Sequence, residues 1–392
     1  MDSIFSFGGV QRVTAVVAKQ LATDHSVSIV TFDKPADCDT SLYGLGEANI
    51  NYRFFAYPEP GWLKLMVCKA FSLAYRKLLP QTRLLSDIYS KTSFPKERRN
   101  ALATFLAEGH YDCIVGVHAP LATRLATMAP QLKGVRLVGW VHNSFEALYS
   151  PGSPYVGPEL KRHYVDQLMK LDATVVLCQH DRQQYEAYEP RFHPMVVYNP
   201  LTLTPGERST GSSKRFLAIG RLSPQHKGFD LLVEAFALFA RGDSEWHLDI
   251  VGEGPEEAAL RQQIADRGMQ QRIHLHPFTN HIEHYYTQAQ VYVLSSRWEG
   301  FGLVLVEAMA HGLPVVSSDL PTSVEIMGDF GIYFANGDVA GLAQALTKST
   351  HIDWNKKSNE AVALAHRFDT KSIADQWRHL LTASSPLQGK RP

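Results

Sequence analysis

The sequence predicts an α/β protein made of two doubly wound domains, each a parallel sheet covered by helices. Three observations indicate this class. The length of 392 residues exceeds that of a usual single domain. Short apolar runs alternate with helical patterns along the chain, which is typical of βαβ units. A stretch rich in Thr, Pro, Gly and Ser at 200–213 separates two such halves, as a linker does.

The predicted domains cover 1–199 and 214–371, and a helical segment within 372–392 is expected to cross back onto the first of them. Two doubly wound domains joined by a hinge form a central cleft at the carboxyl ends of their strands. We therefore expect functional residues in the loops that follow strands. The runs predicted as strands are 27–31, 113–117, 137–141, 173–177, 216–219, 247–251, 273–275, 291–294 and 314–317.

The amino-acid composition indicates which partners and which cellular location to expect. Lys plus Arg and Asp plus Glu both count 39, which gives no indication of a polyanionic partner such as nucleic acid. The 4 cysteines are scattered without zinc-site or disulfide spacing, which is typical of a reducing cytoplasm. We find no signal-peptide pattern and no apolar run long enough to span a bilayer. The expected location is the cytoplasm, at most peripheral on the inner face of the cell membrane.

One predicted helix is strongly basic. It begins at Trp62 and ends at Leu85, and Lys69, Arg76 and Arg83 recur on it every seven residues. The preferred interpretation is a core-packing helix with a solvated basic face. The alternative is a helix that lies on an anionic membrane surface. The apolar stripe opposite the basic residues is formed by Val67, Phe71, Ala74 and Leu78.

A first polar cluster follows the predicted strand 216–219. Gly220 allows a tight turn, and Arg221 and Lys227 place two cations just before a helical pattern at 230–240. Free amides at a helix start favour an anion, and the two cations can neutralise a diphosphate without a metal. The alternative is an ordinary strand–helix turn with two solvated charges.

A second cluster follows the strand 291–294. Glu299 lies in a Gly-rich loop, and Glu307 lies in the helix behind it. The amides of Gly302, Leu303 and Val304 are free at that helix start and can bind phosphate oxygens. Apolar residues flank Glu307 on almost every side, so its burial would cost several kcal/mol unless it is paired or hydrogen-bonded.

Together these motifs resemble the donor-binding domain of the retaining GT-B glycosyltransferases of family 4. The matching stretches are AIGRLSPQHKG, IVGEGPE and SSRWEGFGLVLVEAMAHGLPVVSSDLPTSVEI. Their order and spacing over 216–345 are very specific. The resemblance implies a GT-B fold with two Rossmann-like domains. It also implies transfer of a hexose-type sugar from a nucleotide-diphosphate sugar, a UDP-sugar in the first instance, to a saccharide or lipid-linked acceptor. Surface polysaccharide or lipopolysaccharide biosynthesis is the implied setting, and no metal or other cofactor is expected.

The resemblance also implies roles for residues of the second half. Arg221 and Lys227 would hold the donor diphosphate and stabilise it as the leaving group. Glu307 would bind the ribose, and Glu299 would lie near the transferred sugar. The remaining residues would line the donor pocket, mostly through backbone atoms: Gly220, Gly252, Glu253, Phe278, Gly302, Leu303 and Val304.

The first half matches less closely. Gly9, in a glycine pair before a helical pattern, resembles the family's phosphate-approaching loop, although a plain tight turn explains it equally well. His142, after the strand 137–141, resembles the active-site histidine, and the alternative is a helix cap with a satisfied histidine. Only residues 1–7 precede Gly8, where family members have a full apolar strand. We therefore expect either a chain that starts late or a sheet that lacks one strand and leaves ladder groups unpaired.

Three other classes compete with a transferase. An epimerase of the same fold would release free nucleotide or an isomer without a glycoside product. A phosphorylase of this architecture would need a lysine for pyridoxal phosphate, and no motif indicates one. A catalytically silent nucleotide-sugar-binding scaffold would be expected to have lost part of the set Arg221, Lys227, Glu299 and Glu307, and all four are present.

Overall fold

The computed structural model describes residues 1–204, 206–223, 226–242 and 245–382. Position 205 of the expected linker, positions 224 and 225 of the first motif, and the tail after Thr382 lie outside these described residues. The chain divides into two compact units: unit 1 is Met1–Pro200 with Thr370–Pro392, and unit 2 is Leu201–Asp369. Both are α/β with parallel sheets, so the predicted class is confirmed.

Unit 2 contains one six-stranded parallel sheet of strand order β12-β11-β10-β7-β8-β9. The chain leaves β7 in one direction toward β8 and returns to its other side at β10, so the order reverses between β7 and β10. Ligands of doubly wound sheets bind at such a reversal, outside the carboxyl ends of the strands. The strands are β7 (Arg215–Ile219), β8 (His247–Val251), β9 (Ile273–His276), β10 (Val291–Leu294), β11 (Val315–Ser318) and β12 (Ile332–Phe334).

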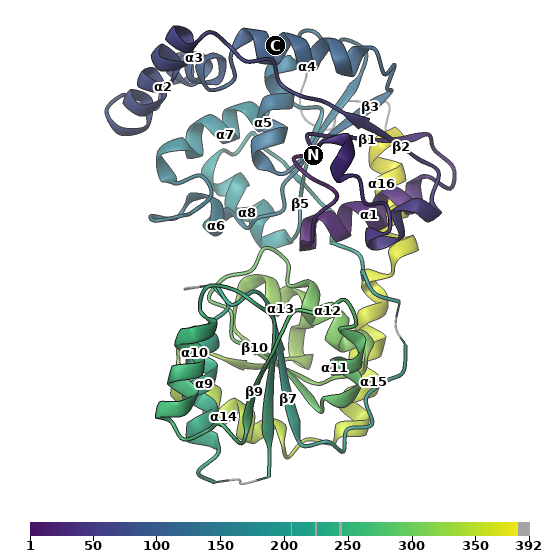
Figure 1. The fold of residues 1–392 in the computed structure, drawn as a ribbon, viewed down its shortest axis with the longest axis vertical. Coiled ribbons are helices and arrows are strands. Elements are labelled where there is room, and N and C mark those ends of the chain that lie inside the picture. The colour runs from purple at the N-terminus through teal and green to yellow at the C-terminus, as the bar shows by residue number, and fades with distance from the viewer. Residues whose placement is uncertain (205, 224–225, 243–244, 383–392) are drawn as a thin grey trace. The chain divides into compact units, whose positions relative to one another are not determined.

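Helices cover both faces of this sheet (Figure 1). Helices α9, α10 and α14 pack together on one face, and α11, α12 and α15 lie on the other. In the core, Phe216 of β7 stacks on Trp246 with ring centroids 4.5 Å apart, and both side chains are buried. The helices are α9 (Phe229–Phe239), α10 (Glu257–Asp266), α11 (Glu283–Gln288), α12 (Leu303–Ala310), α13 (Pro321–Met327), α14 (Val339–Ser349) and α15 (Trp354–Ala365).

Unit 1 differs because its strands form two separate parallel sheets. Strand β1 pairs with β2, and β3, β4, β5 and β6 form a second sheet in that order. Among the described residues, no backbone ladder joins β1 to β3. The strands are β1 (Val27–Thr31), β2 (Ile50–Phe54), β3 (Cys113–Val117), β4 (Arg136–Trp140), β5 (Ala173–Val176) and β6 (Met195–Val196).

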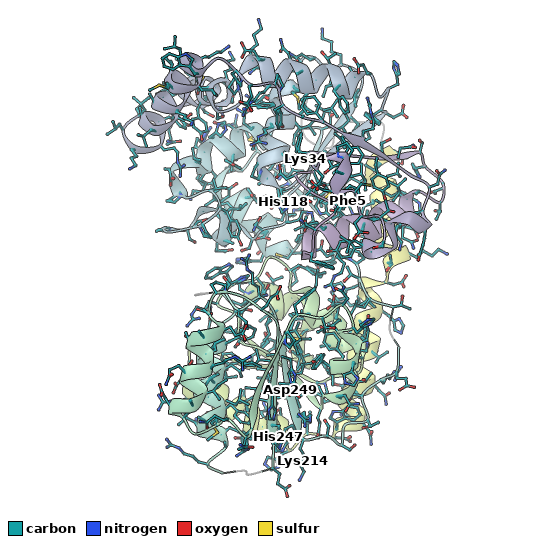
Figure 2. All side chains as sticks on the ribbon, viewed as in Figure 1. Phe5, Lys34, His118, Lys214, His247 and Asp249 are labelled. Atoms are coloured by element: carbon teal, nitrogen blue, oxygen red, sulfur yellow. The ribbon has the colours of Figure 1, made fainter. Side chains whose placement is uncertain are left out.

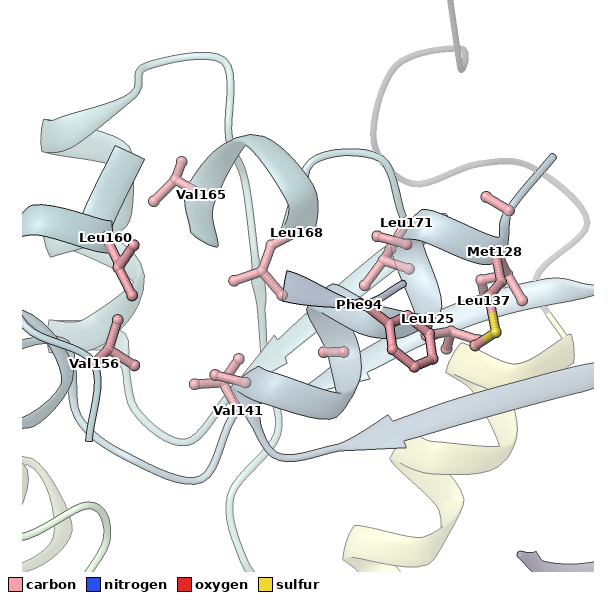
Figure 3. Packing of buried hydrophobic residues seen from close by; sticks show 14 of the residues in the cluster. Phe94, Leu125, Met128, Leu137, Val141, Val156, Leu160, Val165, Leu168 and Leu171 are labelled. Carbon is pink, nitrogen blue, oxygen red and sulfur yellow. The ribbon is translucent and has the colours of Figure 1, made fainter. Parts of the chain in front are cut away.

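The main core of unit 1 lies around β4 and helix α5. Figure 3 shows Leu125 and Met128 of α5 close to Leu137 of β4 and to Phe94, all of them buried. Burying a side chain of this size stabilises the fold by about 1.5–3 kcal/mol. The helices around it are α1 (Gly9–Leu21), α2 (Trp62–Lys77), α3 (Arg83–Ser93), α4 (Lys96–Ala107), α5 (Ala119–Met128), α6 (Phe145–Tyr149), α7 (Lys161–Leu168) and α8 (Gln179–Tyr188).

The last helix, α16 (Thr370–Thr382), belongs to unit 1 although it follows unit 2 in sequence. It packs on α1, where the Arg378 guanidinium donates to the Asp24 carboxylate at 2.9 Å. Trp377 is 1% exposed and lies 4.5 Å from the Trp140 ring. Buried aromatic packing and a surface ion pair therefore help to hold this helix in unit 1.

The prediction of a single basic helix from Trp62 to Leu85 is wrong. The segment forms α2 and α3, with a break that contains Pro80. Proline lacks an amide hydrogen and disfavours helical geometry in the residue before it, so the helix ends ahead of it. Thr82 then caps α3 by accepting the Leu85 amide at 3.4 Å.

The predicted apolar stripe of this segment is also wrong in part. Val67 and Leu78 are 69% and 83% exposed, so neither packs on the core. The side chain that α2 buries is Tyr75, which stacks on Tyr89 of α3 with ring centroids 4.6 Å apart. Aromatic packing between two short helices therefore decides which face of α2 is turned inward.

Candidate functional site

The two motif loops of unit 2 meet where the strand order reverses. The first loop follows β7 and the second follows β10, and these two strands are neighbours in the sheet. Gly228 has a φ of +63°, and a Cβ there would lie 2.1 Å from the carbonyl oxygen of Ser295. Only glycine permits this approach. The Ser295 hydroxyl donates to the Lys227 carbonyl at 2.9 Å, which ties the two loops together.

A buried ion pair lies between these loops. Lys227 Nζ donates to Glu299 Oε1 at 2.6 Å, and the Ser296 hydroxyl donates to the same oxygen at 2.6 Å. Only 14% of the Lys227 side chain and 8% of the Glu299 side chain are exposed. Burial alone would raise the pKa of Glu299, but the Lys227 ammonium, with His226 and Ser296, holds this pKa below its ordinary value. The carboxylate is therefore ionised at neutral pH.

Four further side chains of these loops and of α9 lie around this pair. The His226 ring stacks on Trp298 with centroids 4.9 Å apart and planes 10° apart. Burial, reinforced by the Lys227 charge, lowers the pKa of His226, so its ring is neutral at pH 7. Arg297 makes a two-pronged ion pair with Asp230 at 2.9 and 2.6 Å. The sequence does not indicate these contacts, because they join residues about 70 positions apart.

The loop after β8 lies against the loop after β7. Gly252 has a φ of +153°, and a Cβ there would lie 1.9 Å from the Gly220 carbonyl oxygen. The Leu222 amide donates to the Glu253 carbonyl at 2.9 Å. The side chains of Arg221 and Glu253 are exposed, so both are accessible to a ligand.

The start of helix α12 supplies amides beside the ion pair. Gly302 caps this helix in a left-handed conformation, with φ +83°, and brings no side-chain acceptor. The first turn holds the amides of Leu303 and Val304 and no acidic residue. A helix start of this kind favours an anion. Phe278 lies further along the same edge, in the loop after β9, and its side chain is 46% exposed.

Glu307 is buried inside α12, at 2% exposure. Thr202 donates its hydroxyl to Oε1 at 2.8 Å, and Tyr286 donates to Oε2 at 3.0 Å. The carboxylate is therefore hydrogen-bonded, as its apolar surroundings predict, and its role in binding ribose stays a prediction. The sequence does not indicate that Thr202 and Tyr286 contact Glu307, since Thr202 lies 105 positions from Glu307, within the expected linker.

The two site residues predicted in the first half belong to unit 1. Gly9 is the first residue of α1, and the amide of Gly8 before it donates to the Tyr43 hydroxyl at 2.9 Å. His142 follows β4 and is 7% exposed, with its ring 5.4 Å from that of His118. Figure 2 labels His118 among the side chains of this unit.

His142 lies beside a helix cap, as the alternative interpretation expects. The cap is present, because the Ser144 hydroxyl accepts the Ala147 amide at 3.2 Å. However, Nε2 of His142 is buried with no hydrogen-bond partner among the described residues. Burial, and secondarily the charge of His118, holds the pKa of His142 well below its ordinary value, so the ring is neutral.

Of the predicted site residues, the structure brings Lys227 and Glu299 into direct contact and places the backbones of Gly220 and Gly252 against each other. Arg221, Glu253, Phe278 and Gly302 lie on loops at the carboxyl ends of β7, β8, β9 and β10. Leu303 and Val304 begin α12, and Glu307 is buried inside this helix. The arrangement combines exposed and buried cations, free helix amides and an ionised carboxylate. Such a set can bind and stabilise a diphosphate.

Comparisons with known proteins show what the chain is similar to. Residues 213–350 match the family model described as glycosyl transferases group 1. An uncharacterised glycosyltransferase of Haemophilus influenzae is 29% identical over 97% of this chain and 98% of its own length. A GDP-mannose:cellobiosyl-diphosphopolyprenol alpha-mannosyltransferase of Xanthomonas oryzae is 32% identical over 44% of this chain and 47% of its own length.

Solved structures share the fold. HepE of Anabaena, solved with UDP-glucose, superposes with a TM-score of 0.71 at 19% identity, over 97% of this chain and 98% of HepE. The lipopolysaccharide outer core galactosyltransferase WaaB superposes with a TM-score of 0.65 at 17% identity, over 96% of each chain. The expected GT-B fold is thereby confirmed. Residues 213–350 match the glycosyl transferases group 1 family model, and over almost its whole length the chain is similar to a glycosyltransferase.

Proposed function

We propose that the protein transfers a hexose-type sugar from a UDP-sugar, with retention of anomeric configuration and without a metal, to a saccharide or lipid-linked acceptor in surface glycan biosynthesis. The observation that carries this proposal is the buried Lys227–Glu299 pair beside the open start of α12. The pair fixes a cation where the strand order reverses, which is where doubly wound sheets bind nucleotides.

The chemistry then depends on stabilising the leaving group. As the bond between the anomeric carbon and the diphosphate oxygen breaks, Lys227, Arg221 and the amides of Leu303 and Val304 would neutralise the departing charge. The acceptor oxygen would bond to the anomeric carbon on the same face, and its proton would pass to the departing phosphate oxygen. Glu299 accepts from both Lys227 and Ser296, which favours a positioning role over that of a nucleophile.

The donor and acceptor are inferred from relatives. HepE was solved with UDP-glucose, which favours a uridine nucleotide. The Xanthomonas relative is named for GDP-mannose and a diphosphopolyprenol, which makes GDP-mannose the alternative donor and a polyprenol-linked sugar the first acceptor to try.

A transfer assay tests the whole proposal. The protein is incubated in EDTA with UDP-hexoses, or with GDP-mannose, and a polyprenol-diphosphate sugar, and the product anomer is read by NMR. The expected product is an α-glycoside that forms at the same rate with and without EDTA. An inverted linkage, dependence on a divalent cation, or release of an epimerised nucleotide sugar would each contradict a part of the proposal.

The exposed apolar face of helix α2 supports the proposal that the acceptor is delivered at a membrane. Large apolar side chains of this helix are 57–69% exposed, and Lys69 and Lys77 beside them are exposed too. An amphipathic surface of this kind binds anionic lipid through apolar insertion and charge. Among the described residues, no helix is long and apolar enough to cross a bilayer. The exposed apolar residues are Trp62, Leu63, Met66, Val67 and Leu73.

Liposome flotation tests this membrane contact. The wild-type protein is expected to float with vesicles that contain phosphatidylglycerol. With vesicles of phosphatidylcholine alone it should remain in the bottom fraction. The double variant Met66→Glu/Leu73→Glu should lose most of the floated fraction, because two carboxylates would have to enter the interface. Lys348→Glu, at an exposed position of α14, is the matched control and should float like the wild type. Equal flotation of the Met66→Glu/Leu73→Glu variant would contradict the proposed contact.

A further inference from the structure

A single residue, His118, joins strand β3 to helix α5. Strand β3 ends one residue before His118 and α5 begins one residue after it, so no loop separates them. The His118 amide donates to the Trp140 carbonyl of β4 at 2.9 Å, and the His118 carbonyl accepts the Ala122 amide of α5 at 2.9 Å. The backbone of His118 is therefore fixed by the sheet on one side and by the helix on the other.

This connection imposes an unusual backbone conformation on His118. Its φ is +75° and its ψ is 148°, a combination that is essentially confined to glycine because a Cβ is crowded there. The left-handed conformation that a few other residue types adopt has a ψ of about 30–60°, so His118 lies outside that region as well. A glycine would connect β3 to α5 without this strain. Backbone strain of this kind is concentrated at functional sites.

The side chain of His118 gives little stability in return. It precedes α5 as the N-cap residue but makes no capping hydrogen bond. No hydrogen bond joins its ring to another of the described residues, and the ring lies edge-on to that of His142, with centroids 5.4 Å apart. A phenylalanine would supply the same ring contact. Neither capping nor packing therefore requires a histidine at this strained position.

His142 provides a second imidazole beside the first. It follows β4, the neighbour of β3 in the sheet, and its buried Nε2 has no hydrogen-bond partner among the described residues. Both histidines thus follow the carboxyl ends of adjacent parallel strands, where doubly wound sheets bind ligands. Because buried polar atoms are normally hydrogen-bonded, a nitrogen without a protein partner points to a ligand at this position.

The two rings are suited to a hydroxyl group. Burial lowers the pKa of both histidines, so both rings are neutral at pH 7. A neutral imidazole has one nitrogen that donates a hydrogen bond and one that accepts, and a hydroxyl group also does both. A phosphate or carboxylate would find no positive charge on either ring. The chemistry of the pair therefore matches an uncharged sugar hydroxyl.

We propose that His118 is a specificity-determining residue of the acceptor site and that, together with His142, it binds a hydroxyl group of the acceptor sugar. This role rests on the proposed sugar transfer, in which the donor diphosphate belongs to unit 2, so that the substrate for a hydroxyl site in unit 1 is the acceptor. The strained backbone holds the His118 ring beside that of His142 before the sugar binds, which lowers the cost of ordering the site.

Steady-state kinetics of three variants tests this role. His118→Phe keeps a ring on the same backbone but has no nitrogen, His118→Gly removes both the ring and the strain, and His118→Gln restores a donor and an acceptor. With a polyprenol-diphosphate sugar as acceptor, His118→Phe and His118→Gly should raise the KM for the acceptor about 10-fold, through loss of hydrogen bonding to the sugar. His118→Gln should recover most of this loss. The KM for the nucleotide sugar and the Kd of UDP should keep their wild-type values in all three.

Thermal unfolding separates this role from a structural one. His118→Gly should have a Tm no lower than that of the wild type, because it relieves the backbone strain. The matched control is His110→Gly, at an exposed position of the same unit with a φ of +49°, and it should leave every kinetic constant unchanged. A lower Tm and kcat in His118→Gly with an unchanged acceptor KM would overturn the proposal. A wild-type acceptor KM in His118→Phe, or an increase confined to the KM of the nucleotide sugar, would overturn it too.

A binding experiment distinguishes failure of this site from failure of the proposed function. Saturation-transfer NMR is recorded with methyl α-glucoside and methyl α-mannoside in the absence of nucleotide. At least one of these glycosides should bind to the wild type, and His118→Phe should lose most of the signal. If a glycoside binds in this way but no sugar is transferred in the assay, the proposed function fails and the hydroxyl site stands. No binding to the wild type, or equal binding to the wild type and His118→Phe, would overturn the site.

Discussion

Glu299 of unit 2 and Asp181 of unit 1 are both buried, but their pKa values are shifted in opposite directions. Glu299 of unit 2 would have a raised pKa from burial alone, but Lys227 at 2.6 Å and Ser296 lower it. Asp181 of unit 1 is 1% exposed and accepts the Phe145 amide at 2.8 Å. Burial raises the pKa of Asp181 to about 7. Unit 2 therefore maintains separated charge inside its loops, whereas unit 1 buries a carboxyl that readily becomes neutral.

The sheets of the two units also differ. Unit 2 has six strands in one continuous ladder, and its motif loops all leave the same edge. Unit 1 has a sheet in two pieces, a buried neutral histidine and an exposed apolar helix. The comparison contrasts a buried ion pair in unit 2 with buried groups in unit 1 whose pKa values are shifted toward the neutral form.

The largest expected effect comes from removing the buried cation of unit 2. Lys227→Ala should lower kcat/KM for sugar transfer by about 10²–10³-fold, because the leaving diphosphate loses a preorganised cation. Steady-state kinetics measures this loss, and circular dichroism checks the fold. Lys348→Ala, an exposed lysine on α14, is the control and should match the wild type. Wild-type turnover in Lys227→Ala would contradict the role of this cation in stabilising the leaving diphosphate.

Sequence reasoning succeeded where chemistry requires particular residues close together. The glycines at 228 and 252 are needed because loop backbones approach within contact of one another. The motifs that contain them therefore stand out in the sequence. The main strands were found because their runs are apolar and bounded by polar loops. Sequence alone placed the donor-side loops at one sheet edge for these reasons.

The features that the sequence did not predict depend on tertiary packing. Thr202 was assigned to a linker, yet it donates to Glu307. The break at Pro80 was overlooked because the charge pattern continues across it. Strands β2, β6 and β12 were missed: Ile50–Phe54 carries polar and charged residues, and the other two are only 2 and 3 residues long. Such short or polar strands are set by their neighbours and not by their own pattern.

A smaller effect is expected at the hydrogen-bonded carboxylate of α12. Glu307→Ala leaves the hydroxyls of Thr202 and Tyr286 without this acceptor, which should lower the free energy of unfolding by about 1–3 kcal/mol. Urea unfolding measures the change. Glu207→Ala, at an exposed position of the same unit, should have no measurable effect. If both variants have the same free energy of unfolding, the hydrogen bonds to Glu307 do not stabilise the fold as expected.

The smallest effect concerns Asp181 and its dependence on pH. A carboxyl with a raised folded-state pKa stabilises the fold fully below its unfolded pKa, near 3.8, and loses this contribution as pH rises through about 7. Asp181→Asn keeps an acceptor for the Phe145 amide but cannot ionise. The variant should gain stability relative to the wild type as pH rises from 5 to 8. A stability difference that is flat with pH would contradict the assigned burial of this carboxyl.

The most direct test of the central claim compares the binding of UDP and of uridine in EDTA by titration calorimetry. Charge-assisted bonds from Arg221 and Lys227 should make UDP bind at least about 100-fold more tightly than uridine. In Arg221→Ala/Lys227→Ala this preference should fall below about 10-fold, while uridine binding stays unchanged. A preference for UDP that survives in the double variant, or that appears only when a divalent cation is added, would contradict a diphosphate site made by these two cations.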